Sequence, residues 1–237
     1  IRALCAKEDA EVQFLVGGTQ TNTTVIASIL RPHQGVIAAD TGHINVHETG
    51  AIEATGHKVI ALPNKDGKIA AEQIDACCRE HFSAGNAEHM VQPGMVYVSN
   101  PTEYGTLYTK TELESIRKVC SEYDLILFVD GARMAYGLGA DGNDLTLADY
   151  AAISDVFYIG GTKAGALFGE AVVITDEQLK KDFRYMIKRQ GGMLAKGRLL
   201  GIQYEVLMEG DLYTELGRHA NALAEKIKEA FLRKGYE

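Results

Sequence analysis

Residues 125–130 read LILFVD, a run of apolar residues that ends on an aspartate. A strand with one face in water alternates apolar and polar residues, whereas this run has no polar residue before Asp130. Such a run is typical of a central strand that helices cover on both sides. The stretch therefore predicts a layered α/β fold with a carboxylate at the carboxyl end of a buried strand.

The same pattern recurs along the chain. Further short apolar runs predict strands over residues 36–40, 58–63, 95–100, 156–161 and 171–175. Amphipathic helical stretches lie between them, such as residues 69–82 and 110–122, and Thr109 precedes Glu112 by three residues in a capping-box pattern. Strands that alternate with helices predict an α/β fold with a mostly parallel sheet flanked by helices.

After residue 176 the strand signals stop, and the remainder reads as helices with a break around RQGGML (189–194). No linker, repeat or low-complexity segment divides the chain, so we predict one domain over residues 1–237 with a helical extension over about 176–237. The opening stretch IRALCAKEDAEVQF (1–14) resembles the middle of a helix and has no initiator methionine. We therefore expect this chain to be part of a longer protein.

Composition excludes several classes of partner. The chain has a net charge of −8 and no dense cluster of Lys and Arg, which argues against nucleic-acid binding. No apolar run approaches the roughly 18 residues of a membrane span, and no secretory signal is visible, so we expect no membrane association. The cysteines show neither CxxC nor metal-site spacing, and we expect them to be reduced in a cytoplasmic protein: Cys5, Cys77, Cys78 and Cys120.

Lys163 is the first candidate for chemistry. In VFYIGGTKAGALFG (156–169) this lysine lies among small and apolar residues. A strand-end lysine that extends into solvent is the ordinary explanation. However, the small neighbours leave room for a bulky group close to the backbone, and a lysine amine can form a Schiff base with an aldehyde. Because ligands gather at the carboxyl ends of parallel strands, Lys163 is well placed to hold one.

Two other motifs admit a structural or a functional explanation. The stretch 17–19 (GGT) precedes an amphipathic helix, where free backbone N–H groups and the helix dipole suit a phosphate, although an ordinary turn would look the same. Asp130 precedes Arg133 by three residues. That carboxylate is either a structural partner of the arginine or an acid that faces the site.

A pair of histidines suggests a further possibility. His43 and His47 lie four residues apart in DTGHINVHE (40–48), which on a helix puts both rings on one face. With Asp40 they would resemble a zinc site, but no HExxH motif and no clear third ligand accompany them. A histidine ring that packs on a planar ligand fits the apolar surroundings at least as well.

Together these parts match the needs of pyridoxal phosphate. Its phosphate requires a helix N-terminus, and its aldehyde requires a lysine. Its ring requires a flat partner and a carboxylate at the pyridine nitrogen, which makes the ring an electron sink. The chain supplies these in order with stretch 17–19, His43, Asp130 and Lys163. We therefore predict a pyridoxal 5'-phosphate site with no metal.

On these motifs the chain resembles the fold-type-I pyridoxal-phosphate enzymes, and within them the L-threonine aldolase and β-eliminating lyase family. The resemblance covers nearly the whole chain. It implies an aspartate-aminotransferase-like large domain, with the family's small C-terminal domain outside this chain. It also implies a homodimer or homotetramer with shared active sites.

The resemblance implies roles for the residues before the buried strand. Gly18, Thr19 and Gln20 match the turn that binds the cofactor phosphate in that family. His43, in a GHI motif followed by Glu48, matches the histidine that stacks on the cofactor ring.

Later residues also match. The DGAR motif (130–133) is complete, which implies that Asp130 pairs with the pyridine nitrogen and that Arg133 reaches the substrate carboxylate. Lys163 matches the lysine that forms the Schiff base, with Thr162 beside it as a phosphate contact.

The sequence departs from the family in the segment SNPTEYG (99–105). Typical threonine aldolases have a second histidine there that works on the substrate hydroxyl, and the nearest residue here is Thr102. We expect Thr102 to contact the substrate, with His47 or Glu103 as substitutes for the missing histidine. Further along, Leu194 occupies the place of a family arginine.

The implied reaction cleaves the Cα–Cβ bond of a small, threonine-like β-hydroxy amino acid to glycine and an aldehyde. The same residues would also serve β-elimination or amino-group transfer, because the reaction depends on which substrate bond is aligned. An alternative hypothesis is that the chain is not an enzyme of this kind but a non-catalytic or zinc-binding α/β module.

Overall fold

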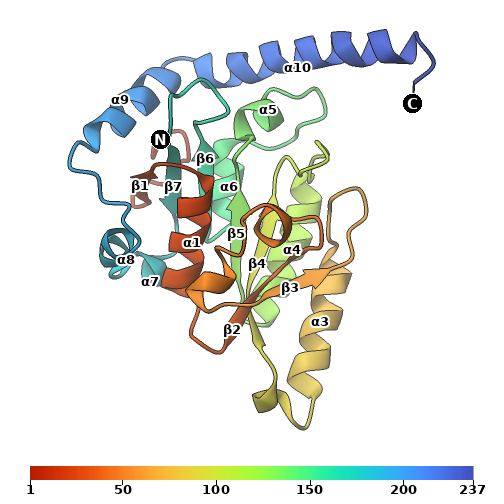
Figure 1. Cartoon of the computed structure of the whole chain (residues 1–237), viewed down its shortest axis with the longest axis vertical. Helices are drawn as coiled ribbons and strands as arrows, with labels where there is room; N and C mark the ends of the chain where they lie inside the picture. The colour runs from red at the N-terminus through yellow and green to blue at the C-terminus, as the bar shows by residue number, and fades with distance from the viewer. Residues whose placement is uncertain (237) are drawn as a thin grey trace.

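The computed structural model describes residues 1–236, which form one seven-stranded sheet with helices packed around it (Figure 1). The strands are β1 (Glu11–Leu15), β2 (Gln34–Ala39), β3 (Val59–Leu62), β4 (Gln92–Ser99), β5 (Ile126–Asp130), β6 (Val156–Gly160) and β7 (Glu170–Ile174). The α-helices are α1 (Gly18–Ile29), α2 (His43–Val46), α3 (Ala71–Ser83), α4 (Lys110–Glu122), α5 (Met134–Leu138), α6 (Leu147–Ile153), α7 (Glu177–Lys180), α8 (Phe183–Arg189), α9 (Arg198–Leu207) and α10 (Leu212–Leu232). Short 3₁₀ turns are η1 (Glu53–Thr55) and η2 (Ala87–His89).

The sheet is mostly parallel, as the sequence predicts. Its strand order is β1-β7-β6-β5-β4-β2-β3, and the pairs from β6 through β3 are all parallel. Strand β7 runs antiparallel to both of its neighbours, β6 and β1. The carboxyl ends of β4, β5 and β6 therefore meet at one edge, and the β6–β7 hairpin carries residues 161–169 at that edge.

Both faces of the sheet are buried, which explains why the strands are apolar throughout. Successive residues of β5 alternate between two clusters: Leu127 and Val129 pack on one face, and Phe128 packs on the other. Helices α3, α4, α6 and α9 contribute to the first cluster, whereas α1 and α8 contribute to the second. Each predicted strand is present, with bounds within three residues of those expected, and α4 spans the predicted 110–122.

The expected helix in the opening stretch is wrong. Residues 2–6 form turns, and residues 11–15 form strand β1 at the sheet edge beside β7. Val12 and Phe14 pack against one core cluster, while Leu15 belongs to the other. This two-residue period is that of a strand, and pairing with β7 favours it over a local helix.

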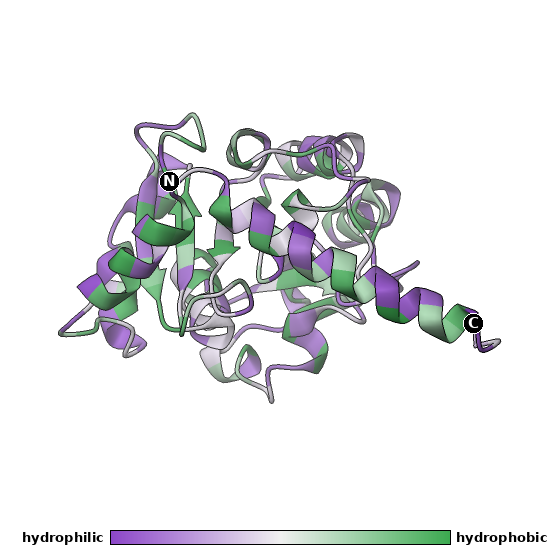
Figure 2. Cartoon of the chain, turned by 90° about the horizontal axis from the view of Figure 1, so that it is seen from above, coloured by the Kyte–Doolittle hydropathy of each residue, from purple (hydrophilic) through white to green (hydrophobic). Residues whose placement is uncertain are grey.

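After β7 the described chain is helical, with α8 ending at Arg189 and α9 beginning at Arg198, on either side of the predicted break. Helix α10 extends beyond the body of the molecule (Figure 1), and polar and apolar residues alternate along it when it is seen from above (Figure 2). Its outer half exposes Leu223, Ile227 and Phe231. Within residues 1–236, no helix has the length and apolar character needed to cross a membrane.

Candidate functional site

Asp130 lies at the carboxyl end of β5 and is only 3% exposed. Its carboxylate accepts hydrogen bonds from the Tyr97 hydroxyl on β4 and from the Ala132 backbone N–H, the latter at 2.9 Å. Burial, and then the charge of Asp130, raises the pKa of Tyr97 and of Tyr158 well above the ordinary value. Both phenols therefore stay protonated, so Tyr97 is a fixed donor to the carboxylate.

Lys163 lies in the β6–β7 hairpin, at the same edge as Asp130. Desolvation lowers the pKa of its ammonium, and the nearby Arg133 guanidinium lowers it further. The carboxylates of Asp130, Glu170 and Glu103 act in the opposite direction. The residue is exposed on the loop, yet its amine is close enough to these charges to respond to them. Lys163 thus combines access with a larger neutral fraction than an ordinary surface lysine.

The glycines before Lys163 are required for a reason that the sequence does not reveal. A Cβ on Gly160 would lie 2.5 Å from the Ala132 carbonyl oxygen, and one on Gly161 would lie 2.7 Å from the Tyr204 hydroxyl. The sequence predicts that these glycines leave room for a bulky group. That prediction is wrong for Gly160 and Gly161, because neighbouring atoms already fill the space beside them. These glycines allow β6 to pack closely against the backbone after β5 and against α9.

The start of α1 has the features of an anion site. Its N-cap is Gly17, with no side-chain cap and no acidic residue in the first turn. The first N–H groups of a helix have no partner within the helix, so those of Gly18 and Thr19 are available to a ligand. A Cβ on Gly18 would lie 3.5 Å from the Tyr158 hydroxyl, which places this helix start beside β6.

The side chains of Gln20 and Thr162 have structural partners. Gln20 accepts a hydrogen bond from the Val16 N–H at 3.3 Å and donates to the Gln190 carbonyl at 3.4 Å, so it ties the turn before α1 to the end of α8. The Thr162 hydroxyl accepts from the Gly169 N–H at 3.1 Å and closes the lysine loop. A contact from Gln20 to phosphate would therefore come from its backbone N–H.

His43 is the first residue of α2, and its ring lies next to the buried side chain of Glu48. Its Nε2 atom lies 3.6 Å from Oε1 of Glu48, whose side chain is 1% exposed, against 26% for His43. Asn22 on α1 donates to the same Glu48 oxygen at 2.9 Å. The backbone N–H of His43 donates at 3.0 Å to Oε1 of Glu103, which also accepts from the Ser99 hydroxyl at 2.7 Å. Glu103 thereby joins α2 to the end of β4.

The histidine pair does not form a metal centre in the described chain. The rings of His43 and His47 have centroids 5.5 Å apart. The Asp40 carboxylate instead accepts hydrogen bonds from Asn64, at 2.6 Å from the side chain and 3.2 Å from the backbone. Across residues 1–236, no group of three or more His, Cys, Asp or Glu side chains could hold a metal ion. The zinc alternative therefore lacks a third ligand.

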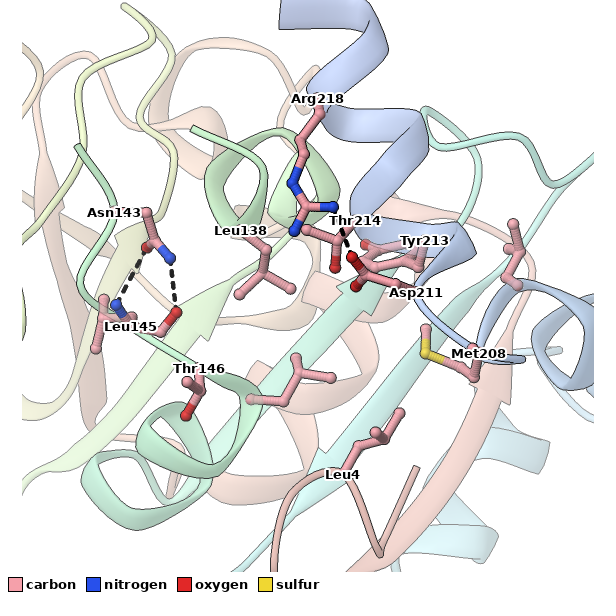
Figure 3. Close-up of a pocket in the computed structure, with 13 residues that line it drawn as sticks. Leu4, Leu138, Asn143, Leu145, Thr146, Met208, Asp211, Tyr213, Thr214 and Arg218 are labelled. Carbon is pink, nitrogen blue, oxygen red and sulfur yellow. Dashed lines mark hydrogen bonds and ion pairs between the residues drawn. The ribbon is translucent and has the colours of Figure 1, made fainter. Parts of the chain in front are cut away.

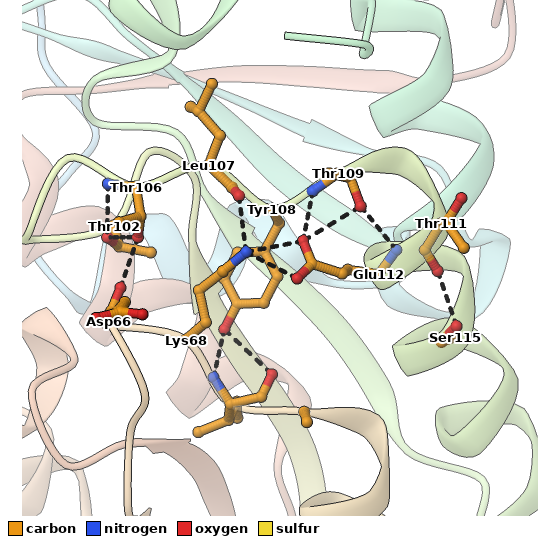
Figure 4. Close-up of polar contacts among 12 residues, drawn as sticks. Asp66, Lys68, Thr102, Thr106, Leu107, Tyr108, Thr109, Thr111, Glu112 and Ser115 are labelled. Atoms are coloured by element: carbon orange, nitrogen blue, oxygen red, sulfur yellow. Dashed lines mark hydrogen bonds and ion pairs between the residues drawn. The ribbon is translucent and has the colours of Figure 1, made fainter. Parts of the chain in front are cut away.

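The expectation that Thr102 contacts the substrate finds no support in this geometry. The Thr102 hydroxyl lies 2.7 Å from the Thr106 hydroxyl and accepts from the Thr106 N–H at 3.2 Å (Figure 4). Its side chain packs against Gly67, where a Cβ would lie 2.8 Å from the hydroxyl oxygen. Thr102 is buried within its own turn, whereas the next residue, Glu103, contacts the start of α2.

Arg133 is the N-cap residue of α5 and lines a cavity of about 550 Å³ together with Pro101, Tyr136 and Arg218. Arg218 is paired with Asp211 at 2.6 Å (Figure 3), whereas no ion pair of Arg133 occurs within residues 1–236. The cavity of Figure 3, about 360 Å³ between the N-terminal segment and α10, is lined by none of the predicted site residues. Arg133 is therefore the guanidinium available to an anionic ligand at the lysine edge.

Glu170 is a buried carboxylate beside Lys163 that the sequence motifs did not single out. It is the first residue of β7, 3% exposed, and its Oε2 accepts from the Gly161 N–H at 3.0 Å. Burial raises its pKa to about 7, and the charge of Asp130 adds to this, while hydrogen bonds and Lys163 oppose it. The signal in the sequence was a charged residue at the head of the apolar run AVVIT (171–175).

Comparisons with known proteins show the family of this chain. The sequence profile of the beta-eliminating lyase family matches residues 1–234. The chain belongs to the beta-eliminating lyase family. The chain is 32% identical over 224 residues to a low specificity L-threonine aldolase of Pseudomonas sp. (strain NCIMB 10558). This match covers 92% of this chain and 63% of that relative. A low specificity L-threonine aldolase of Saccharomyces cerevisiae is 24% identical, over 94% of this chain and 56% of the relative.

Solved structures that resemble this chain include a threonine aldolase and an aminotransferase. A threonine aldolase of Leishmania major superposes with a TM-score of 0.96 and 50% identity, covering all of this chain and 68% of that one. Aspartate aminotransferase of Thermus thermophilus superposes with a TM-score of 0.73 at 17% identity, which shows the expected aminotransferase-like fold. The chain spans 63% of the length of the Pseudomonas relatives that it matches.

Proposed function

We propose that this chain is the cofactor-binding part of a pyridoxal-phosphate-dependent lyase that cleaves a threonine-like β-hydroxy amino acid to glycine and an aldehyde. The observation that carries the proposal is the position of Lys163, with its lowered pKa, at the strand edge that also holds the buried Asp130. The 50% identity to a threonine aldolase of Leishmania major supports the choice of reaction.

The residues present fit the cofactor. The first turn of α1 has free N–H groups and no acid to repel a phosphate, and Asp130 is a buried carboxylate with a fixed tyrosine donor. The ring of His43 is partly exposed above Glu48, so one face is available for stacking. These groups would hold the phosphate, the ring nitrogen and the ring face, respectively.

The chemistry divides between the cofactor and the chain. Pyridoxal phosphate, when bound, supplies an electron-withdrawing ring that accepts the electron pair left on the substrate Cα. Lys163 must be neutral at Nζ to react with an aldehyde, and its lowered pKa increases that fraction. Arg133, free of an internal ion pair, orients the substrate carboxylate by a charge-assisted hydrogen bond. Asp130 would place its carboxylate at the ring nitrogen.

Glu103 is our candidate for the group that accepts the substrate hydroxyl proton. Its Oε1 is engaged by Ser99 and the His43 N–H, which leaves Oε2 available. Its charge acts on the Lys163 ammonium, so it faces the site from the end of β4. A carboxylate fixed through one oxygen can take a proton at the other. Glu103 thus substitutes for the histidine that Thr102 replaces.

The cofactor is tested by colour and by covalent trapping. The purified full-length protein is expected to be yellow, and borohydride is expected to fix pyridoxal phosphate on the peptide that contains Lys163. Lys163→Ala removes the adduct, whereas Lys118→Ala, on the exposed face of α4, retains it. A colourless protein that takes up no pyridoxal phosphate would refute the proposed cofactor.

The reaction is tested by product. We expect acetaldehyde from threonine, and pyruvate from serine at a much lower rate. The family description makes β-elimination the second candidate, and the absence of the second histidine at Thr102 favours it in part. Pyruvate as the sole product, with no acetaldehyde from threonine, would establish β-elimination instead.

A carboxylate variant tests the proton acceptor. Glu103→Gln removes the basic oxygen but keeps a side chain of similar size, so we expect kcat for threonine cleavage to fall by about 10²-fold or more. The cofactor absorbance should be retained, since Glu103 does not hold the lysine. The matched control is Glu80→Gln on the exposed face of α3, which should keep wild-type kcat. Unchanged kcat in Glu103→Gln would exclude this residue as the base.

We further propose a cytoplasmic homodimer or homotetramer with shared active sites. The four cysteines are free in the structure, which is typical of a reducing compartment. Lys196, exposed between α8 and α9, is a candidate for a phosphate contact in a neighbouring subunit. Light scattering of the full-length protein measures the assembly directly.

A further inference from the structure

Glu170 lies beneath the lysine loop and holds its first residue. The side chain is 3% exposed, and its Oε2 accepts from the Gly161 N–H at 3.0 Å. Gly160 and Glu170 are paired across the β6–β7 hairpin, so the carboxylate lies where the loop leaves the sheet. The loop is closed above by hydrogen bonds from the Gly161 and Thr162 N–H groups to the Gly169 carbonyl, at 3.0 and 3.1 Å.

Among the described residues, Lys163 supplies the positive charge that opposes the raised pKa of Glu170. From α9, the Tyr204 hydroxyl donates to the Ile159 carbonyl at 2.5 Å, and from α10, the Tyr213 hydroxyl donates to the Gly160 carbonyl at 2.7 Å. Both phenols are therefore used by backbone carbonyls. From β5, Asp130 adds a negative charge, and from the loop itself Lys163 supplies the opposing positive one. No salt bridge of Glu170 is formed within residues 1–236.

We propose that Glu170 is a positioning residue for Lys163: its buried carboxylate anchors the first amide of the loop and supports the positive charge of the lysine amine. This role rests on the proposed function only in that Lys163 is the reactive amine. The two groups respond to each other, since ionised Glu170 raises the Lys163 pKa and the Lys163 ammonium lowers the Glu170 pKa. When Lys163 loses its charge, Glu170 loses an opposing positive charge and its pKa rises.

Two substitutions separate the anchor from the charge. Glu170→Gln keeps an oxygen that accepts from the Gly161 N–H but removes the charge, whereas Glu170→Ala removes both. Glu177→Gln is the matched control, because that carboxylate is 75% exposed on α7 and pairs with Lys180. All are made in the full-length protein, and any bound aldehyde is first removed with hydroxylamine and dialysis.

The measurement is the rate at which trace acetic anhydride acetylates Lys163 as a function of pH, followed by mass spectrometry of the peptide. Only the neutral amine reacts, so the midpoint reports the Lys163 pKa. We expect Glu170→Gln to lower the midpoint by about half a unit or more, which makes labelling about threefold faster below it. Glu177→Gln should match the wild-type curve. Glu170→Ala should behave as Glu170→Gln and also increase chymotryptic cleavage at Leu167, which is 88% exposed.

A Glu170→Gln midpoint at or above that of the wild type would overturn the proposal. A second measurement needs no variant: the wild-type profile should show an additional inflection near pH 7, where Glu170 ionises. A single transition in the wild type would also count against the coupling. Because labelling requires no bound cofactor, these results remain interpretable even if the protein proves not to bind pyridoxal phosphate.

Discussion

At the scale of single residues, the site depends on two buried carboxylates, each of which accepts hydrogen bonds from specific donors. Asp130 is held by the Tyr97 hydroxyl and a backbone N–H, and Glu170 by the Gly161 N–H. A buried carboxylate without donors is costly, because its loss of hydration is not repaid. The donors therefore determine whether each acid can remain charged where a ligand would meet it.

Removing the Tyr97 hydroxyl should destabilise the protein. Tyr97→Phe leaves the Asp130 carboxylate buried with one donor fewer, and we expect the free energy of unfolding to fall by about 2 kcal/mol. Urea denaturation measures the change. Tyr185→Phe, at a tyrosine that is 77% exposed, should stay within about 0.5 kcal/mol of wild type. Equal stability of the two variants would show that the tyrosine hydrogen bond contributes nothing.

Glu170 should make stability depend on pH. Its pKa is about 7 in the folded protein, above the ordinary 4.5, so between these values the folded state binds more protons than the unfolded state. Stability from this group is therefore full below about pH 4.5 and is lost as pH rises through 7. The loss is on the order of 3 kcal/mol at most.

Glu170→Gln removes that dependence. Urea denaturation of wild type and variant at pH 5 and pH 8 should show the variant gaining stability relative to wild type at the higher pH. The comparison cancels the titration of the other carboxylates, which both proteins share. A difference between wild type and variant that is the same at both pH values would contradict the raised pKa.

At the scale of elements, the β6–β7 hairpin depends on close approach to the segment after β5. Gly160 lies where a Cβ would be 2.5 Å from the Ala132 carbonyl and 2.7 Å from the Gly131 carbonyl. Backbone atoms cannot move aside as a flexible side chain can. The glycines of GGTK thus fix the distance between the loop that carries Lys163 and the strand end that carries Asp130.

A methyl group at Gly160 should therefore push the loop that carries Lys163 away from the end of β5. We expect Gly160→Ala to lower the free energy of unfolding by about 3 kcal/mol, because the added carbon overpacks the strand end. Gly142→Ala is the control, since a Cβ there meets nothing within 4 Å and the change should be nearly neutral. Urea denaturation distinguishes them, and similar stability of both variants would contradict the close packing.

At the scale of the whole molecule, the parallel sheet gathers residues that are far apart in the chain. The start of α1, His43, Asp130 and Lys163 come from four segments and lie around the carboxyl ends of the central strands. A ligand that contacts all of them joins these segments in the folded state only. Ligand binding should therefore stabilise the protein as a whole.

We expect pyridoxal phosphate to raise the melting temperature of the cofactor-free full-length protein. At 100 times the dissociation constant the gain is about 2.7 kcal/mol, by mass action. Lys163→Ala should show a smaller rise, because phosphate and ring contacts remain without the covalent bond. An identical rise in wild type and Lys163→Ala would mean that the lysine does not hold the cofactor.

By itself the sequence determined the strands and helices whose signals are local. The apolar run 125–130 predicts β5, and the capping box of Thr109 and Glu112 predicts the start of α4 at the correct residue. Each of these signals arises from neighbours within a few residues. The combination of Asp130 and Lys163 was also evident, since motif order reflects strand order in such folds.

Only the tertiary structure decided what depends on partners distant in the chain. Strand β1 forms because β7 lies beside it, and the Thr102 side chain is buried in its own turn because it hydrogen-bonds to Thr106 and packs against Gly67. Glu170 became visible only when burial and its place beneath the lysine loop were known. The pKa of Glu170 depends on desolvation and on charges from distant parts of the chain, and the spacing of residues in the sequence predicts neither.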